Sequence, residues 1–129
     1  MPQATLSDPA GAKLDLATLR GKPVLINLWA TWCAPCVKEL PTLDALAGKG
    51  VDVVTVAQDM GEPARVAAAL HYPHLHAWLD PDNTLGFYYN SGVLPTSALY
   101  DADGREVWRM VGAHDWSGET AATLTRLKS

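Results

Sequence analysis

The sequence has little of several residue types that mark common classes of protein, and each shortage excludes one of them. Its 129 residues include only two cysteines and four histidines. Two cysteines alone cannot close a structural zinc site, which normally needs four ligands. Hydrophobic residues make up 48% of the chain, enough for a core without disulfide staples. The cysteines are therefore not needed to hold the fold together.

Clustered positive charge and long apolar runs are also lacking. The formal net charge is −4, and Lys and Arg form no cluster, which argues against nucleic acid or an anionic membrane surface as the main partner. No apolar run approaches the ~18 residues of a membrane span, and the segment Met1-Pro2-Gln3 does not begin a signal peptide. We expect a periplasmic or other extracytoplasmic domain whose signal or anchor has been removed, or alternatively a cytoplasmic protein.

Two apolar runs predict a pair of buried parallel strands joined by a helix. Residues 23–29 and 51–57 are continuous and include β-branched side chains, as in strands buried on both faces. Between them, residues 33–46 carry apolar side chains at helical spacing before Gly48, and Pro41 is expected to kink this helix. A strand, a helix and a parallel strand in this order make a right-handed βαβ unit.

The second half of the chain predicts a ββα unit. An Asp-Gly pair signals a hairpin between strands at residues 96–100 and 106–111, and residues 117–127 are predicted to form an amphipathic helix with Ser117 as its N-cap. Weaker elements are expected at residues 13–16 (strand), 17–20 (helical turn), 62–70 (helix), 77–79 (strand) and 83–89 (helical turn). No repeat or linker interrupts the chain, so we expect residues 1–129 to form one α/β domain with helices on both faces of a mixed sheet.

Cys33 and Cys36 lie at the start of the predicted helix, directly after the first buried strand. There, unpaired backbone N–H groups and the positive end of the helix dipole stabilise a thiolate, which lowers the pKa of a cysteine from its usual value of about 8.5. We expect Cys33 to be an exposed nucleophile and Cys36, one turn later, to resolve a mixed disulfide. Their spacing brings the sulfur atoms within bonding reach. The alternatives are two unrelated thiols or half of a metal site.

Three segments resemble a known family. GKPVLINLWATWCAPCVKELP (residues 21–41) is similar to the active-site segment of thioredoxin-fold oxidoreductases, and more narrowly to that of the TlpA/ResA-like group of exported thiol-disulfide reductases. DLATLRGK (residues 15–22) and GVLPTSALYDADGRE (residues 92–106) resemble the same group and occur in its order. The resemblance implies a thioredoxin fold, with βαβ then ββα around the sheet, an extra N-terminal strand and a connecting helix.

The resemblance also implies a loop that faces the cysteines. The Leu94–Pro95 bond would be cis and Pro95 would lie against the Cys33 sulfur, where a proline cannot coordinate a metal. The backbone of Leu94 would then be free to pair with an extended substrate peptide. The alternative is an ordinary trans bond in a turn before a strand.

The neighbours of the cysteines are predicted to contact the substrate and to tune the redox potential. Trp32, Ala34 and Pro35 would lie on the surface that meets the partner, with core packing as the alternative for Trp32. The dipeptide Ala34-Pro35 resembles the reductive members, whereas oxidants of the DsbA type carry a histidine in place of the proline. Between about −270 mV for thioredoxin and about −120 mV for DsbA, we expect a potential in the reducing half.

The group that accepts the Cys36 proton is harder to assign. Thioredoxins have a buried aspartate six residues before the first cysteine, but this chain has Asn27 there, which cannot titrate and is common in the TlpA/ResA-like group. The resemblance points instead to a glutamate near the end of the next strand. Asp59 and Glu62 are the candidates, with Glu62 preferred; the alternative is that both are surface loop acids.

No metal or cofactor is predicted besides the redox-active disulfide itself. His71, His74 and His76 lie close together in the sequence, but Pro73 breaks any shared helix face and no acidic or cysteine ligand adjoins them. An exposed loop is therefore expected there.

The predicted function is that of a thiol-disulfide oxidoreductase, a protein-disulfide reductase in the bacterial cell envelope, with cytochrome c maturation or related metalloprotein assembly as suitable processes. The resemblance implies a protein substrate and a membrane protein that supplies electrons, and we expect a monomer. One alternative is a general thioredoxin or a disulfide oxidant of the same fold. Another is a non-catalytic module whose thiols bind copper or zinc.

Overall fold

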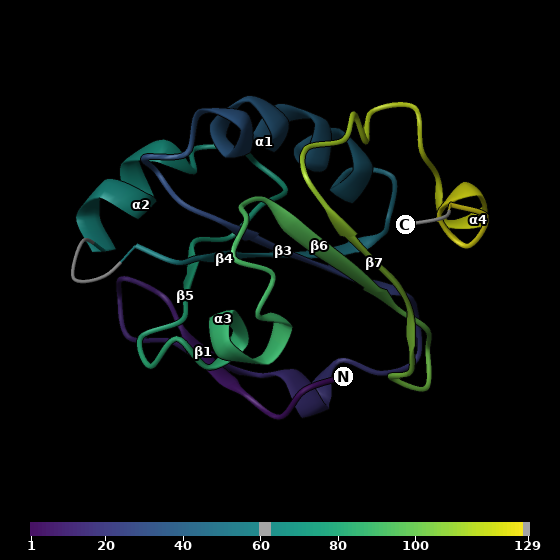
Figure 1. Cartoon of the computed structure of the whole chain (residues 1–129), viewed down its shortest axis with the longest axis horizontal. Coiled ribbons are helices and arrows are strands. Elements are labelled where there is room, and N and C mark those ends of the chain that lie inside the picture. The colour runs from purple at the N-terminus through teal and green to yellow at the C-terminus, as the bar shows by residue number, and fades with distance from the viewer. Residues whose placement is uncertain (60–62, 128–129) are drawn as a thin grey trace.

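A mixed sheet is the framework of the computed structural model, which describes residues 1–59 and 63–127. Within these residues, seven strands lie in the order β2-β1-β5-β4-β3-β6-β7 (Figure 1). The strands are β1 Thr5–Ser7, β2 Lys13–Asp15, β3 Val24–Trp29, β4 Asp52–Ala57, β5 Trp78–Leu79, β6 Thr96–Tyr100 and β7 Glu106–Val111. The helices are the short 3₁₀ turn η1 Leu16–Thr18, α1 Ala34–Ala47, α2 Pro63–Ala69, α3 Thr84–Tyr89 and α4 Ala121–Leu124.

The central strand β3 brings the two halves of the chain together. It pairs in parallel with β4, to which α1 connects it, so the predicted βαβ unit is confirmed. On its other side it pairs antiparallel with β6, with Leu28 opposite Thr96. Because β6 runs in the opposite direction, the segment before Thr96 lies next to the residues that follow β3. This pairing places residues 94–95 beside the cysteines.

Helices cover both faces of the sheet (Figure 1). Side chains of α1, α2 and α4 share one core with Leu25 and Trp29 of β3. Side chains of α3 and η1 share a second core with Ile26 and Leu28. All six residues of β3 are buried, as the continuous apolar run predicts for a strand covered on both faces. Asn27 is the polar member of this strand, and it faces α1, where it bonds to a helix side chain.

The N-terminal segment forms a hairpin that the sequence predicts only in part. A strand is expected at residues 13–16, but β1 also forms and pairs antiparallel with β2, with Leu6 opposite Leu14. The side chain of Leu6 is fully buried in the second core. One buried leucine in a strand of three residues leaves no alternating pattern long enough to be recognised in the sequence.

The C-terminal helix is shorter than predicted. Instead of residues 117–127, it covers only Ala121–Leu124. Ser117 is not its N-cap, because the backbone N–H and the hydroxyl of Ser117 both donate to the Asp115 carboxylate. Thr120 is the N-cap and forms a reciprocal capping box with the third residue of the helix. The local turn at Asp115 therefore competes successfully with the helix that periodicity predicts.

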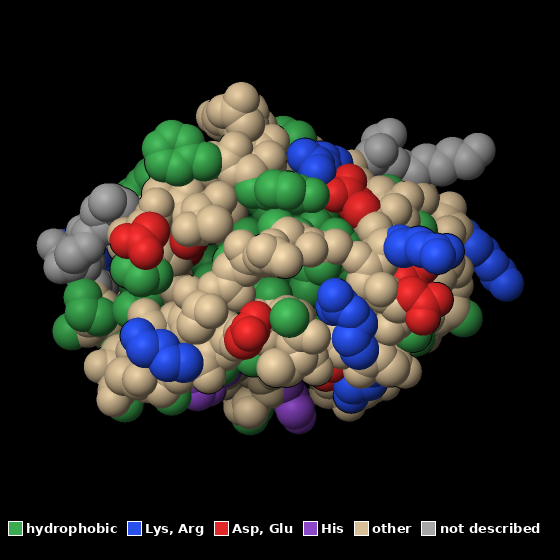
Figure 2. All heavy atoms as spheres, turned by 90° about the horizontal axis from the view of Figure 1, so that it is seen from below, with side chains coloured by type: hydrophobic (Ala, Val, Ile, Leu, Met, Phe, Trp, Pro, Cys, Tyr) green, Lys and Arg blue, Asp and Glu red, His purple; other side chains and the backbone are tan. Residues whose placement is uncertain are grey.

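The longest helix of the described residues is α1, which continues through Pro41 to Ala47. In the ranges 1–59 and 63–127, no helix is both long enough and apolar enough to cross a membrane. Figure 2 views the molecule from the side of β1 and α3, and on this face Lys and Arg side chains are interspersed with Asp and Glu.

Candidate active site

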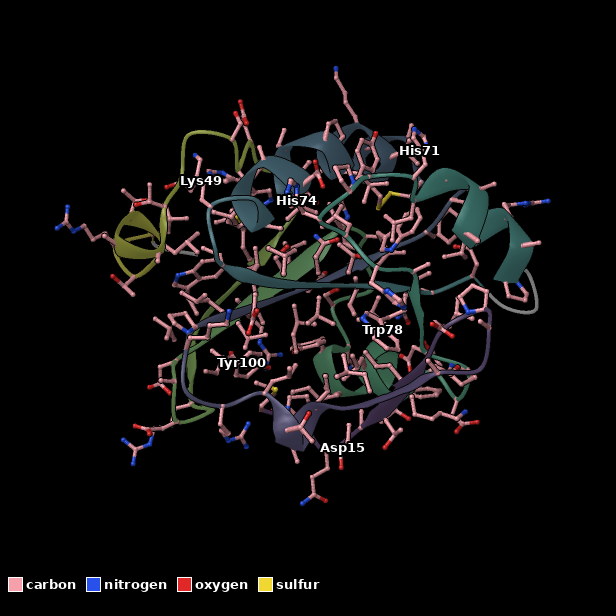
Figure 3. The ribbon with its side chains drawn as sticks, turned by 180° about the vertical axis from the view of Figure 1, so that it is seen from behind. Asp15, Lys49, His71, His74, Trp78 and Tyr100 are labelled. Carbon is pink, nitrogen blue, oxygen red and sulfur yellow. A yellow bond between two sulfur atoms is a disulfide. The ribbon has the colours of Figure 1, made fainter. Side chains whose placement is uncertain are left out.

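Cys33 and Cys36 form a disulfide where β3 ends and α1 begins. Figure 3 shows this bond in yellow, at the end of α1 nearer to α2. Cys33 is the N-cap of the helix, and its Sγ accepts a hydrogen bond from the Cys36 backbone N–H at 3.3 Å. When the pair is reduced, this N–H and the helix terminus would stabilise a thiolate at Cys33.

The two cysteines differ in exposure. Cys33 retains 7% of its accessible surface and Cys36 retains none, so Cys33 is less exposed than the sequence predicts for an attacking thiol. The reason is that Cys33 packs against the loop before β6. Trp32, next to it, is 70% exposed, and Ala34 and Pro35 are exposed as well. Cys33 is still the member of the pair that a partner can reach first.

The loop before β6 lies against Cys33, as the resemblance implies. The Leu94–Pro95 bond is cis, and Pro95 is buried. The Leu94 carbonyl oxygen lies 3.7 Å from Cys33 Sγ, a van der Waals contact because a disulfide sulfur has no hydrogen to donate. The carbonyl of Pro95 accepts a hydrogen bond from the Gly112 N–H at 2.8 Å. The loop is thereby tied to the end of β7.

Glu39, which the sequence analysis does not single out, is a buried acid on α1. Its side chain is only 3% exposed, and it lies one helical turn after Cys36, on the same face of the helix. Asn27 Nδ2 donates to Oε1 of Glu39 at 2.9 Å. The His114 backbone N–H and the Trp116 indole N–H donate to Oε2 at 2.8 and 3.0 Å. The carboxyl group is therefore enclosed by three donors from two separate parts of the chain, β3 and the loop after β7.

Burial raises the pKa of Glu39 above the usual glutamate value, because desolvation penalises the charged form. The hydrogen bonds from His114, Trp116 and Asn27 act in the opposite direction, since they stabilise the ionised carboxylate. Desolvation is the largest of these effects. Glu39 thus holds its proton to a higher pH than an exposed glutamate does, a property suited to a group that exchanges protons with a thiol.

The predicted acid Asp59 has a different place in the structure. One of its carboxylate oxygens accepts a hydrogen bond from the Thr31 backbone N–H at 2.8 Å, and the other accepts from the Thr31 hydroxyl. Asp59 therefore holds the turn that leads from β3 to Cys33. The other predicted acid, Glu62, lies outside the described residues.

One signal in the sequence could have identified Glu39. It follows Cys36 by three residues, and the buried side chains of α1 are Cys36, Glu39, Leu40, Leu43 and Leu46. An acid on the buried stripe of an amphipathic helix is uncommon, because a charged group is seldom buried without partners. The partners themselves cannot be read from local periodicity.

Asn27 connects the sheet to this carboxyl group. Its Nδ2 donates both to Glu39 and to the Ser97 hydroxyl on β6, each at 2.9 Å. Its Oδ1 is buried and has no hydrogen-bond partner among the described residues. The residue at the position of the thioredoxin aspartate thus supports an acid on α1 instead of carrying the acid itself.

A cleft of about 620 Å³ opens beside the disulfide, and Glu39 forms part of its wall. One wall is the first half of α1 and the other is the segment that follows β7. The lining residues are Ala34, Pro35, Lys38, Glu39, Thr42, Ala113, His114 and Asp115. The cleft therefore links the exposed residues between the cysteines to the buried carboxyl group.

The histidines of residues 71–76 make separate contacts. His74 Nδ1 lies 3.4 Å from an Asp44 carboxylate oxygen, and His76 Nε2 lies 2.9 Å from Asp8. The His71 ring contacts the carbonyl oxygen of residue 68; His71 and His74 are labelled in Figure 3. In the part of the chain that the structure describes, no three His, Cys, Asp or Glu side chains gather as a metal site.

The redoxin family model matches residues 1–126, so the match includes the whole site. The chain belongs to the redoxin family. Among this redoxin's relatives, the thiol-disulfide oxidoreductase ResA of Bacillus cereus is 34% identical over 116 residues, which cover 86% of this chain and 67% of ResA. The thiol:disulfide interchange protein DsbE of Pseudomonas aeruginosa is 35% identical over 128 residues, which cover 95% of this chain and 71% of DsbE.

A solved structure agrees with this assignment. The pneumococcal exposed lipoprotein thioredoxin of Streptococcus pneumoniae superposes with a TM-score of 0.83 at 26% identity, covering 98% of this chain and 100% of that one. The predicted thioredoxin-like α/β fold and the resemblance to the ResA group are confirmed. With its cysteine pair at disulfide distance, this redoxin is a thiol-disulfide oxidoreductase, and its substrates are thiols and disulfides.

Proposed function

We propose that this redoxin reduces disulfides of other proteins in the bacterial cell envelope. The observation that carries the proposal is a buried acid, Glu39, one helical turn after a Cys-x-x-Cys pair at the N-terminus of α1. The dipeptide Ala34-Pro35 supports the reducing direction, because it lacks the histidine that stabilises the thiolate in strong oxidants. Similarity to an exposed lipoprotein thioredoxin supports a location outside the cytoplasm.

The reaction begins at Cys33. Its thiolate attacks one sulfur of a substrate disulfide, and the other substrate sulfur leaves as a thiolate that takes up a proton. Cys36 then loses its proton to the Glu39 carboxylate and attacks the Cys33 sulfur. This step forms the Cys33–Cys36 disulfide and releases the second substrate sulfur as a thiolate, which takes up a proton. Two electrons have passed from the cysteine pair to the substrate.

Substrate binding is assigned to the surface around Cys33. An extended peptide would pair with the backbone of Leu94, while Trp32, Ala34 and Pro35 would contact its side chains. Pro95, buried behind Leu94, would hold this backbone against the sulfur. The half-buried position of Leu94 and the 70% exposure of Trp32 support these roles. The protein acts as a monomer, and a membrane electron donor reduces its disulfide after each cycle.

The direction of electron flow can be tested by a redox potential. Equilibration of this redoxin with glutathione or dithiothreitol buffers, followed by tryptophan fluorescence, is expected to give a value more negative than about −200 mV. A value near −120 mV, that of DsbA, would contradict the reducing direction and favour an oxidant of the same fold.

The proposed intermediate can be trapped with Cys36→Ser. Without its resolving thiol, this variant should accumulate mixed disulfides with envelope proteins, seen as bands that dithiothreitol removes on a non-reducing gel. The double variant Cys33→Ser/Cys36→Ser is the control and should form none. The variant is exposed to an envelope extract and to a cytoplasmic extract. If it captured only cytoplasmic proteins, the proposed location would be abandoned. If it captured no protein from either extract, the proposal of a protein substrate would be abandoned.

A further inference from the structure

The loop that follows β7 supplies two of the three donors on Glu39, and its own position is fixed by a side-chain pair. His114 Nε2 lies 2.9 Å from a Glu119 carboxylate oxygen. The His114 ring also packs edge-on against Trp116, with ring centroids 4.5 Å apart. His114 and Glu119 are largely buried, with 29% and 15% of their side-chain surfaces exposed. The pair therefore connects the two ends of the loop between β7 and α4.

Glu119 is itself held in place. Its second carboxylate oxygen accepts a hydrogen bond from the Thr123 hydroxyl at 2.7 Å. The Lys49 ammonium donates to the backbone carbonyl oxygens of Ser117 and Glu119 at 2.6 and 2.9 Å. Glu119 thus anchors the His114 ring to the start of α4 and to the turn after α1.

We propose that the His114–Glu119 pair is a positioning device for the active-site acid: it keeps the His114 backbone N–H and the Trp116 indole N–H aimed at one oxygen of Glu39. Neither residue reacts. Both act through the loop, because two donors in a fixed arrangement stabilise a buried carboxylate only while the loop holds them there. The proposal rests on the proposed function only for the catalytic role of Glu39. The positioning of the two donors can be measured separately, in the oxidised protein.

Several charged groups face this pair and must be considered in any pH effect. Glu39 and Lys38 approach from α1, and both line the cleft together with His114. Asp115 lies next to His114 on the loop, and Glu119 is the partner of the His114 ring. Lys49 approaches from the turn after α1. The direct effect of the Glu119 charge and the positioning of the loop by Glu119 change the pKa of Glu39 in opposite directions. Removal of the Glu119 charge therefore tests the proposal.

The decisive variant is Glu119→Gln. If Glu119 acted only through its own charge on Glu39, its removal would favour ionisation of Glu39 and lower the pKa of Glu39. The charge of His114 also lowers the pKa of Glu39, and His114→Gln separates this effect, because it removes the charge and keeps a side chain that can bond to Glu119. If Glu119 positions the loop, its loss weakens the two hydrogen bonds from the loop to Glu39. The ionised form of Glu39 is then less favoured, and the pKa of Glu39 rises. The expected result is a rise of about half to one pH unit, a three- to tenfold gain in proton affinity. His114→Ala should give a rise of the same size, and His114→Gln, whose amide can still reach Glu119, a smaller one.

The measurement is an NMR titration of the Glu39 carboxyl carbon in the oxidised protein, where the cysteines do not titrate. Glu39→Gln identifies the signal by removing it. His74→Gln is the matched control, because His74 also contacts a carboxylate of α1 but makes no bond to Glu39, and its midpoint should equal that of the wild type. A midpoint in Glu119→Gln that is unchanged within about 0.2 pH unit, or lowered, would overturn the proposal.

Turnover separates this proposal from the proposed function. If Glu39 accepts the Cys36 proton, the pH profile of reductase activity should move with the NMR midpoint in Glu119→Gln. If the midpoint moves and the profile does not, the positioning proposal stands and the catalytic role of Glu39 fails. If Glu39→Gln alters the pH profile of activity but Glu119→Gln alters neither this profile nor the NMR midpoint, only the positioning proposal fails.

Discussion

Cys33→Ser is expected to abolish disulfide reduction by this redoxin. A serine hydroxyl is not ionised near neutral pH, so the helix N-terminus and the Cys36 N–H at 3.3 Å would have no thiolate to stabilise. Insulin reduction should fall to the rate without protein, a loss of roughly 10³-fold or more. The assay follows the turbidity of reduced insulin with dithiothreitol as the electron donor.

Cys36→Ser provides the contrast that assigns the roles of the two thiols. It should also fail to turn over, but unlike Cys33→Ser it should form a covalent complex with oxidised insulin. Mass spectrometry of the complex would place the bond at Cys33. Retention of more than about a tenth of wild-type turnover by Cys33→Ser, or a complex formed through Cys36 in that variant, would contradict the order of attack derived from the exposure of the two residues.

Trp116→Ala is expected to cause the largest loss of stability. Trp116 is fully buried, stacks parallel to Trp108 with ring centroids 6.0 Å apart and donates its indole N–H to Glu39. Removal of an indole from a core costs about 3–5 kcal/mol, and a buried carboxyl would also lose a donor. Urea unfolding of the oxidised protein, followed by circular dichroism, should show this decrease in the free energy of unfolding.

Two further variants separate packing from the hydrogen bond. Trp116→Phe keeps an aromatic ring but loses the N–H, and a loss of about 1–3 kcal/mol is expected. Trp32→Ala, at a site that is 70% exposed, should change stability by less than about 0.5 kcal/mol. Equal losses in Trp116→Ala and Trp116→Phe would show that the hydrogen bond, and not the buried ring, carries the effect.

Much of the fold follows from patterns within single elements. The apolar runs around residues 23–29 and 51–57 predict strands buried on both faces, and the structure has β3 and β4 there. The prediction for residues 117–127 is wrong because periodicity does not register the Asp115 side chain, which binds Ser117 and holds the chain in a turn. A local side-chain bond of this kind competes with a helix on nearly equal terms.

By itself, the sequence determined where the redox chemistry lies. A buried strand followed by Cys33 and Cys36 at a helix start, with a Leu94-Pro95 segment before a later strand, is a local pattern, and the family resemblance placed the two parts together. Only the tertiary structure revealed that an acid, Glu39, is buried on the same face of α1 as Cys36. The donors on Glu39 come from Asn27, His114 and Trp116, which are 12, 75 and 77 residues away in the chain.

The physical reason for this difference is the distance along the chain over which each kind of interaction acts. Helix dipoles and backbone propensities act over a few neighbouring residues, so a motif and its segment reveal them. Burial of a carboxyl group, and the donors that compensate for it, depend on which distant segments the packed core brings together. For this redoxin, the sequence located the thiols and their helix, and packing of the loop after β7 against α1 determined how the acid beneath them is held.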